Sequence, residues 1–194
     1  MYKYFYRVSK AVVSSRAGAR VLFFPSLLWI VATESRSRRW FDRIDSTVIL
    51  GALPFKSQTQ KLIDENVKGV ITLNEEFETK HLCNSKQEWF AWGVTQLRLA
   101  TVDFGNAPSF AQLLEGVKFI EDMRSKGDSV YVHCKAGRGR STTLVACYLM
   151  KNKNLNPEEA HLFIKSKRPQ IRLASQQWIA LQQFHDHLHQ KKNS

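Results

Sequence analysis

His133-Cys134-Lys135-Ala136-Gly137-Arg138-Gly139-Arg140-Ser141 decides the fold of this chain, because a strand pattern precedes this stretch and a helix pattern follows it. Residues 129–132 are mainly β-branched and aromatic, as in a buried strand. Residues 142–150 form a mostly apolar run typical of a buried helix. Two glycines let the intervening loop curl, so that its N–H groups and the helix N-terminus can surround an anion. The stretch therefore predicts an α/β fold with a phosphate-binding loop at the end of a strand.

A cysteine followed, after five residues, by an arginine supplies the side chains needed to attack a phosphate monoester. We expect Cys134 to be the nucleophile, with a thiol pKa lowered to about 3.5–7.5 by the loop, the helix dipole and Arg140. The planar fork of Arg140 should grip two phosphoryl oxygens. Ser141 should donate a hydrogen bond to the Cys134 sulfur, and His133 should hydrogen-bond the loop backbone. The other loop residues predicted to bind phosphate are Lys135, Ala136, Gly137, Arg138 and Gly139.

A general acid is also needed, because the departing alkoxide must take up a proton. Asp103 is our candidate: it follows an apolar strand pattern at 94–99 and begins a loop whose glycine and proline suit a structured lid. It lies 31 residues before Cys134, enough for one crossover helix between neighbouring parallel strands. Asp128 is the alternative, but it lies between a glycine and a serine in a pattern typical of a turn entering the next strand.

These residues predict hydrolysis in two steps. Cys134 displaces the alcohol while Asp103 protonates it, and water activated by Asp103 then hydrolyses the phosphocysteine. The scheme requires no metal ion and no cofactor, because Arg140 and the loop amides supply the positive charge.

Two loop cations, Lys135 and Arg138, exceed what a single phosphomonoester needs. They could bind a second negative group of the substrate, such as a phosphodiester or another phosphate. Arg138 could instead face solvent or pair with an acid.

An acidic run follows the strand predicted at residues 69–73, on the side where open α/β sheets build their sites. Its members, which could line the substrate site or pair with the loop cations, are Glu75, Glu76 and Glu78. The alternative is that Asn74 caps a short helix whose first turn tolerates glutamate.

The remaining pattern alternates strands with helices and predicts a mostly parallel sheet of about five strands covered by helices on both faces. Beyond the segments above, we expect a strand at 48–53 and helices at 57–66, 110–125, 157–167 and 176–187. The three histidines after residue 184 should lie in a solvated tail rather than bind a metal.

Composition indicates one domain in a reducing compartment. The chain has 194 residues, enough for a substantial core. Its three cysteines, Cys83, Cys134 and Cys147, make no plausible disulfide framework. Cys147 should lie in the core, whereas the place of Cys83 and a redox role for it stay open.

The net charge is strongly positive, +12 at pH 7. Residues 1–45 contain nine Lys or Arg and three acids, and no acid precedes Glu34. A basic, serine-containing segment without acids is typical of a mitochondrial targeting sequence. We therefore expect a targeting or membrane-proximal segment at 1–36 and the catalytic domain at 37–190.

An apolar run at residues 21–32 lies within this basic segment. Its 12 residues, interrupted by Pro25, are too few to span a bilayer. They could lie in the membrane interface with Trp29 at headgroup level, or pack on the domain. Nucleic acid would also attract so basic a chain. We expect no nucleic-acid binding, because the strongest basic cluster is already assigned to phosphate.

Four further segments make the sequence similar to a known family. They are residues 40–45 (WFDRID), 49–54 (ILGALP), 69–78 (GVITLNEEFE) and 96–103 (QLRLATVD). With the Cys134 loop they resemble the mitochondrial protein-tyrosine-phosphatase-like branch of the dual-specificity phosphatases, whose members dephosphorylate phosphatidylglycerophosphate on the route to cardiolipin. The resemblance covers roughly residues 20–188.

The resemblance implies a dual-specificity phosphatase fold, an acid on the loop of Asp103 and an acidic loop at the mouth of the site. It implies an anionic phospholipid substrate at the matrix side of the inner mitochondrial membrane, and we expect a monomer. The Cys134 loop also resembles that of phosphoinositide phosphatases, so a phosphoinositide or phosphoprotein substrate is the alternative. A third possibility is an inactive phosphate-binding adaptor, against which the intact Cys134, Asp103, Arg140 and Ser141 argue.

Overall fold

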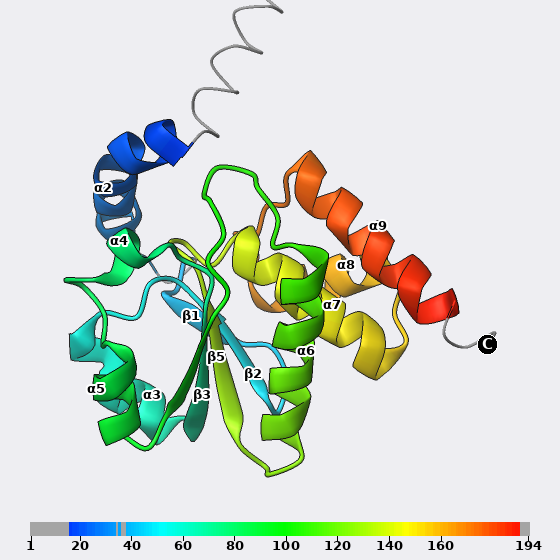
Figure 1. Cartoon of the computed structure of the whole chain (residues 1–194), viewed down its shortest axis with the longest axis horizontal. Coiled ribbons are helices and arrows are strands. Elements are labelled where there is room, and N and C mark those ends of the chain that lie inside the picture. The colour runs from blue at the N-terminus through cyan, green and yellow to red at the C-terminus, as the bar shows by residue number, and fades with distance from the viewer. Residues whose placement is uncertain (1–15, 34, 36–37, 191–194) are drawn as a thin grey trace, which may run out of the picture.

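The computed structural model describes residues 16–33, 35 and 38–190, and its centre is a five-stranded sheet (Figure 1). The strands are β1 (Phe41–Arg43), β2 (Val48–Gly51), β3 (Val67–Thr72), β4 (Thr95–Arg98) and β5 (Ser129–His133). Their order across the sheet is β1-β2-β5-β3-β4, and only the β1–β2 pair is antiparallel. The predicted mostly parallel sheet of five strands is confirmed.

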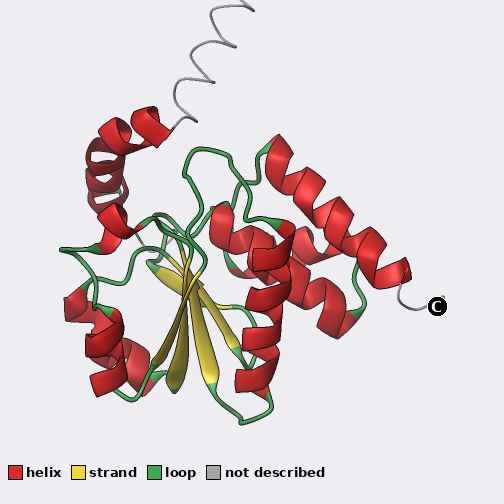
Figure 2. Ribbon diagram, in the orientation of Figure 1, coloured by secondary structure: helices red, strands yellow, loops and turns green. Residues whose placement is uncertain are grey.

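Helices cover both faces of this sheet (Figure 2). One face carries α3 (Thr59–Asp64) and α5 (Lys86–Ala91). The other carries α6 (Phe110–Arg124), α7 (Arg140–Lys153), α8 (Pro157–Lys167) and α9 (Ser175–Gln190). Every residue of β2 and β5 is buried, which explains the apolar sequence of β2 (VILG) and of the middle of β5 (VYV). The catalytic loop, residues 134–140, thus leaves a fully buried strand of the sheet.

The helix starts follow local capping chemistry. Ser109 and Gln112 form a capping box at α6, and Asn156 and Glu159 form another at α8, where Pro157 occupies the first turn. Helix α9 continues to Gln190, past the predicted end at residue 187. Its last histidines therefore lie on a helix rather than in a tail, and among the described residues no cluster of three or more potential metal ligands occurs.

The predicted adjacency of the Asp103 strand and the Cys134 strand is wrong. Strand β3 lies between β4 and β5, so the chain that follows β4 passes over β3 to reach β5. The burial patterns explain this order: β3 is almost entirely buried, whereas both ends of β4 are exposed, as suits an edge strand.

Two helices stand at the same end of the sheet as the catalytic loop. They are α2 (Arg16–Ala32) and the short α4 (Glu76–Thr79). Helix α2 packs on the domain through Phe23 and Leu27, which lie against Leu53 and Cys83. No helix in the described part of the chain is long and apolar enough to cross a membrane.

Candidate active site

The catalytic loop turns its carbonyl groups outward. Four consecutive carbonyls, at residues 135–138, accept hydrogen bonds from outside the loop: from the backbone N–H groups of Leu53 and Arg172 and from the Arg168 guanidinium. The C=O and N–H of a trans peptide point in opposite directions, and the described chain has no cis peptide bonds. The N–H groups of residues 136–139 therefore face the inside of the loop, as an anion-binding nest requires.

Glycine is required in this loop for two different reasons. Gly137 has a φ of 64°, and a side chain there would collide with the Gly51 carbonyl. Gly139 has an ordinary φ of −125°, but an added Cβ would lie 2.9 Å from the Gln177 side chain. Of these two glycines, only Gly137 adopts the left-handed conformation that glycine permits.

Cys134 lies buried at the base of this loop, where its thiolate is favoured. The Ser141 hydroxyl donates a hydrogen bond to Sγ at 3.2 Å, as predicted. Burial alone would raise the pKa of Cys134, but the Arg140 charge and hydrogen bonds from the Ser141 side chain and backbone hold it below the ordinary thiol value. This is the environment of an activated cysteine.

Arg140 begins α7 and is held from behind by Glu78. Its Nη1 and Nη2 donate to the two Glu78 carboxylate oxygens at 2.8 and 3.0 Å, and Nη1 also donates to the Thr101 carbonyl at 2.8 Å. Burial opposes the charge, yet Asp103 and Glu78 hold the pKa of Arg140 above its usual value. The buried Nε has no hydrogen-bond partner in the described structure, so the Nε edge is available for a phosphoryl oxygen.

The acidic run therefore supplies one partner for Arg140 rather than a row of equivalent ligands. Glu78 is buried, Glu75 is half-buried, and Glu76 is exposed. Glu75, rather than the expected Asn74, is the N-cap of α4, and its N–H donates to Glu78. Asn74 instead donates to the other Glu78 oxygen at 2.6 Å. None of the ion pairs formed by the described residues joins this run to Lys135 or Arg138.

Asp103 lies beside Arg140, as its predicted role of general acid requires. One carboxylate oxygen is 3.1 Å from Arg140 Nη2, and the other pairs with the ammonium of Lys135. Burial would raise the pKa of Asp103, but Arg140 and Lys135 outweigh burial and lower it. A phosphoryl dianion on Arg140 would compete with this carboxylate and raise its pKa, which would prepare Asp103 to carry a proton.

Lys135 connects the catalytic loop to the N-terminal helix. Besides Asp103, its ammonium donates to Ser26 Oγ of α2 at 2.8 Å and lies 4.2 Å from the centre of the Phe104 ring. Lys135 is buried, so it acts on the Asp103 loop and does not protrude as a free cation. Its role in binding a second anionic group stays a prediction.

His133 is buried under the loop and stays neutral. Its Nε2 lies 2.9 Å from the Thr72 hydroxyl at the end of β3. Burial lowers its pKa to about 3, despite a hydrogen bond with the Cys134 backbone that works the other way. A neutral ring joining two strands fits the predicted structural role.

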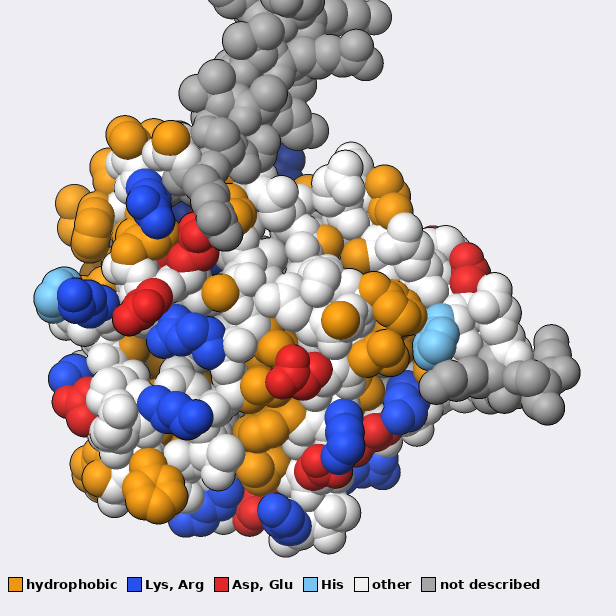
Figure 3. Space-filling view, viewed as in Figure 1, with side chains coloured by type: hydrophobic (Ala, Val, Ile, Leu, Met, Phe, Trp, Pro, Cys, Tyr) orange, Lys and Arg blue, Asp and Glu red, His pale blue; other side chains and the backbone are white. Residues whose placement is uncertain are grey.

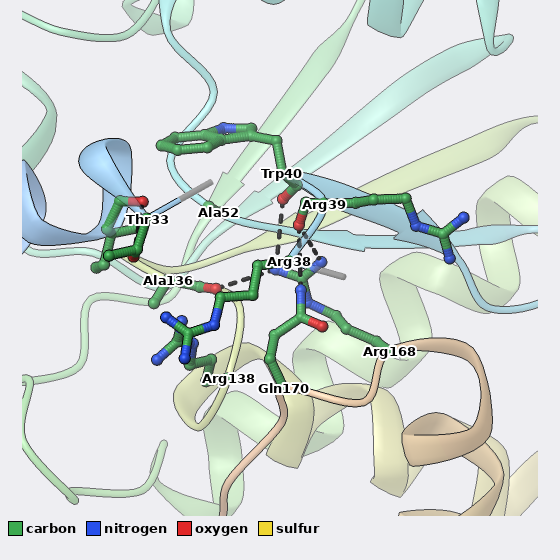
Figure 4. A pocket seen from close by; sticks show the side chains of 10 residues that line it. Thr33, Arg38, Arg39, Trp40, Ala52, Ala136, Arg138, Arg168 and Gln170 are labelled. Carbon is green, nitrogen blue, oxygen red and sulfur yellow. Dashed lines mark hydrogen bonds between the residues drawn. The ribbon is translucent and has the colours of Figure 1, made fainter. Parts of the chain in front are cut away.

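Arg138 lies in a basic hollow on the outer side of the loop (Figure 4). Arg38 lines the same hollow. Arg39 also lines it, but its guanidinium turns away from Arg138 and pairs with Asp42 at 2.6 Å (Figure 4). Burial and the charges of Arg38 and Arg168 lower the pKa of Arg138. The structure thus groups cations at this edge of the loop instead of pairing Arg138 with an acid.

Sequence reasoning missed two residues that hold the site in place. Arg168, just past α8, is buried and donates to the Gly137 carbonyl at 2.9 Å and to Asp42 at 2.6 Å. Gln177 of α9 is also buried and donates to the Asn106 carbonyl in the Asp103 loop. Asn106 in turn donates to the Asp103 carbonyl. In the sequence, Arg168 stands before Pro169 at the end of a predicted helix, and this pattern by itself indicates only where the helix ends.

The other cysteines take no part in this site. Burial raises the pKa of Cys83 to about 12, and it also raises that of Cys147. Both are free thiols. Cys147 lies in the core, as predicted.

Comparison with known proteins agrees with this geometry. Residues 48–187 match the family described as dual specificity phosphatase, catalytic domain. The chain is 51% identical over 172 residues to the Homo sapiens protein named phosphatidylglycerophosphatase and protein-tyrosine phosphatase 1, covering 86% of each chain. It is 44% identical over 170 residues to phosphatidylglycerophosphate phosphatase PTPMT1 of Arabidopsis thaliana, covering 87% of this chain and 50% of the plant protein.

A crystal structure of PTPMT1 in complex with PI(5)P superposes with a TM-score of 0.78 and 48% sequence identity, covering 79% of this chain and 99% of that one. The match thus extends far beyond the catalytic loop. The chain belongs to the dual specificity phosphatase family, in the branch that contains phosphatidylglycerophosphatase and protein-tyrosine phosphatase 1.

Proposed function

We propose that this cysteine-dependent phosphatase hydrolyses the phosphomonoester of phosphatidylglycerophosphate. The observation that carries the proposal is a second cationic group, Arg138 with Arg38, directly beside the phosphate-binding loop. Phosphatidylglycerophosphate has a phosphodiester separated from its phosphomonoester by one glycerol. A simple phosphomonoester would leave these cations without a partner. The named activity of the human and plant relatives supports the same substrate.

The proposed mechanism follows from the site. The Cys134 thiolate attacks phosphorus, and the oxygen–phosphorus bond to the glycerol breaks as Asp103 gives that oxygen a proton. Arg140 and the loop N–H groups hold the phosphoryl oxygens as charge redistributes. Asp103 then takes a proton from water, which attacks the phosphocysteine and releases inorganic phosphate. Ser141 stabilises the departing thiolate.

A phosphoinositide is the second candidate, and one observation favours it. One of the PTPMT1 crystal structures that this chain resembles is a complex with PI(5)P, which also combines a phosphomonoester with a phosphodiester. The same two cationic groups would suit both lipids. We therefore propose an anionic phospholipid at a membrane surface, with phosphatidylglycerophosphate preferred.

Phosphate release from phosphatidylglycerophosphate, a phosphatidylinositol monophosphate and a phosphotyrosine peptide tests the proposal, with Cys134→Ser as the blank. We expect kcat/KM to be about tenfold or more higher on phosphatidylglycerophosphate. A preference for the inositol lipid or the peptide would retain the chemistry and overturn the substrate.

We further propose that the protein works at the matrix side of the inner mitochondrial membrane. The support is the basic, acid-free start of the sequence, of which residues 1–15 lie outside the described part of the chain. Imaging of the tagged full chain, followed by protease protection in isolated mitochondria, tests this location.

A further inference from the structure

Helix α2 presents an apolar surface that no other part of the described chain covers. Only Phe23 and Leu27 of its large apolar side chains are buried, and they pack on the domain. The large apolar side chains left between 36% and 75% exposed are Val21, Leu22, Phe24, Leu28, Trp29 and Val31. These are six of the eleven exposed large hydrophobics found among the described residues.

The exposed side chains share one side of the helix. At about 100° per residue they fall within roughly half of its circumference. Residues 21–32 contain no charged side chain that would interrupt this surface. Figure 3 shows apolar side chains gathered over α2 at the upper left of the molecule. A helix that is apolar all round needs cover on all sides, and the domain covers only one.

Both ends of this surface are basic. Near the start of the helix, the Arg20 guanidinium lies 5.1 Å from the centre of the Phe77 ring. At the other end, Ile30 and Thr33 line the same hollow as Arg38 and Arg138. Apolar side chains flanked by arginines match a phospholipid interface that carries anionic headgroups.

The opposite side of α2 touches the catalytic loop. Ser26 accepts the hydrogen bond from Lys135, and the Lys135 ammonium lies 5.7 Å from the centre of the Phe23 ring. The exposed apolar surface and the active site are thus separated by about one helix diameter, of the order of 10 Å. A lipid interface on the outer side of α2 would place the catalytic loop near the headgroups.

We propose that α2 binds the enzyme to the surface of a bilayer that contains anionic phospholipids. The outer, apolar side of α2 lies in the interface, and the inner side of α2 lies against Lys135. This membrane contact rests on the proposed function and deepens it, because it explains how a site at the end of the sheet reaches a lipid headgroup. A second copy of the chain is a poorer occupant, because pairing two such surfaces would also bring their basic ends together.

The test measures binding of the full chain to sedimented vesicles of phosphatidylcholine, with and without phosphatidylglycerol. The variant carries Phe24→Ser, Leu28→Ser and Trp29→Ser. We expect the parent to bind preferentially to the anionic vesicles and the variant to lose that binding by about tenfold or more. Its kcat/KM on soluble p-nitrophenyl phosphate should stay at the parental value, because none of the three residues touches the active site.

A matched control replaces three exposed apolar side chains on other helices, with Phe90→Ser, Leu162→Ser and Ile179→Ser. The control should bind vesicles as the parent does. Equal loss of binding in both variants, or parental binding by the α2 variant, would overturn the proposed membrane contact of α2. A parent protein that is a dimer in light scattering, together with an α2 variant that is a monomer, would overturn it as well. If vesicle binding depends on α2 but the enzyme does not hydrolyse phosphatidylglycerophosphate, the membrane contact of α2 stands and only the proposed substrate is overturned.

Discussion

Replacing Glu78 by glutamine tests whether the acidic run acts through Arg140. The Glu78 carboxylate accepts four hydrogen bonds, two from Arg140, one from Asn74 and one from the Glu75 N–H. Each oxygen receives two of them. A glutamine amide would place its NH₂ group against two donors in either orientation, and it would remove the charge that compensates the buried guanidinium.

The size of the effect follows from burial. The side chains of Glu78 and Arg140 are each only 1% exposed. Breaking a buried ion pair from one side costs about 3–5 kcal/mol of unfolding free energy. The Arg140 fork would also lose its orientation, and a misplaced catalytic group costs on the order of 10²-fold in rate. We therefore expect both a stability loss and a fall in kcat/KM on p-nitrophenyl phosphate.

The assay combines urea unfolding with kinetics measured well below the unfolding midpoint. Glu115→Gln, at an exposed position of α6, is the control for loss of a carboxylate and should change stability by less than about 0.5 kcal/mol. Glu78→Asp keeps the charge and should retain more activity than Glu78→Gln. If Glu78→Gln matched the Glu115 control in both measurements, the inferred role of the Arg140–Glu78 pair would be refuted.

Four further changes test other parts of the site. Cys134→Ser should abolish turnover yet keep phosphate binding in calorimetry, because Arg140 and the loop amides remain; measurable turnover would remove Cys134 as the nucleophile. Asp103→Asn should lower kcat by about 10²–10⁴-fold and flatten the alkaline limb of its pH profile, whereas undiminished activity would place the acid elsewhere. Arg168→Met should cost about 3 kcal/mol and lower kcat/KM, because two loop carbonyls lose their donor and buried Asp42 keeps only the exposed Arg39 as a partner; parental unfolding in urea would contradict this. Because the pKa of His133 is about 3 when folded, its contribution to stability is complete above about pH 6.5 and falls by about 1.4 kcal/mol per pH unit below that value. His133→Gln should lack this slope, and an equal slope in both proteins would assign it to another group.

The sequence by itself determined the parts of the site whose residues are neighbours along the chain. The strand, the loop and the helix around Cys134 form one continuous segment, so local backbone preferences fix how Cys134, Arg140 and Ser141 lie relative to one another. The capping pattern at Asn156 likewise fixed the start of α8, because each bond in a capping box spans only three residues.

The tertiary structure decided which distant residues meet. Strand β3 lies between β4 and β5 because its side chains are buried on both faces, a comparison between strands that no local pattern makes. That order brings Glu78 to Arg140, 62 residues away, rather than to Arg138. Arg168 reaches Asp42 across 126 residues. A charge that loses its water when the complete fold buries it is costly unless an opposite charge lies beside it. That partner comes from a distant part of the chain, so only the tertiary structure shows which residue it is.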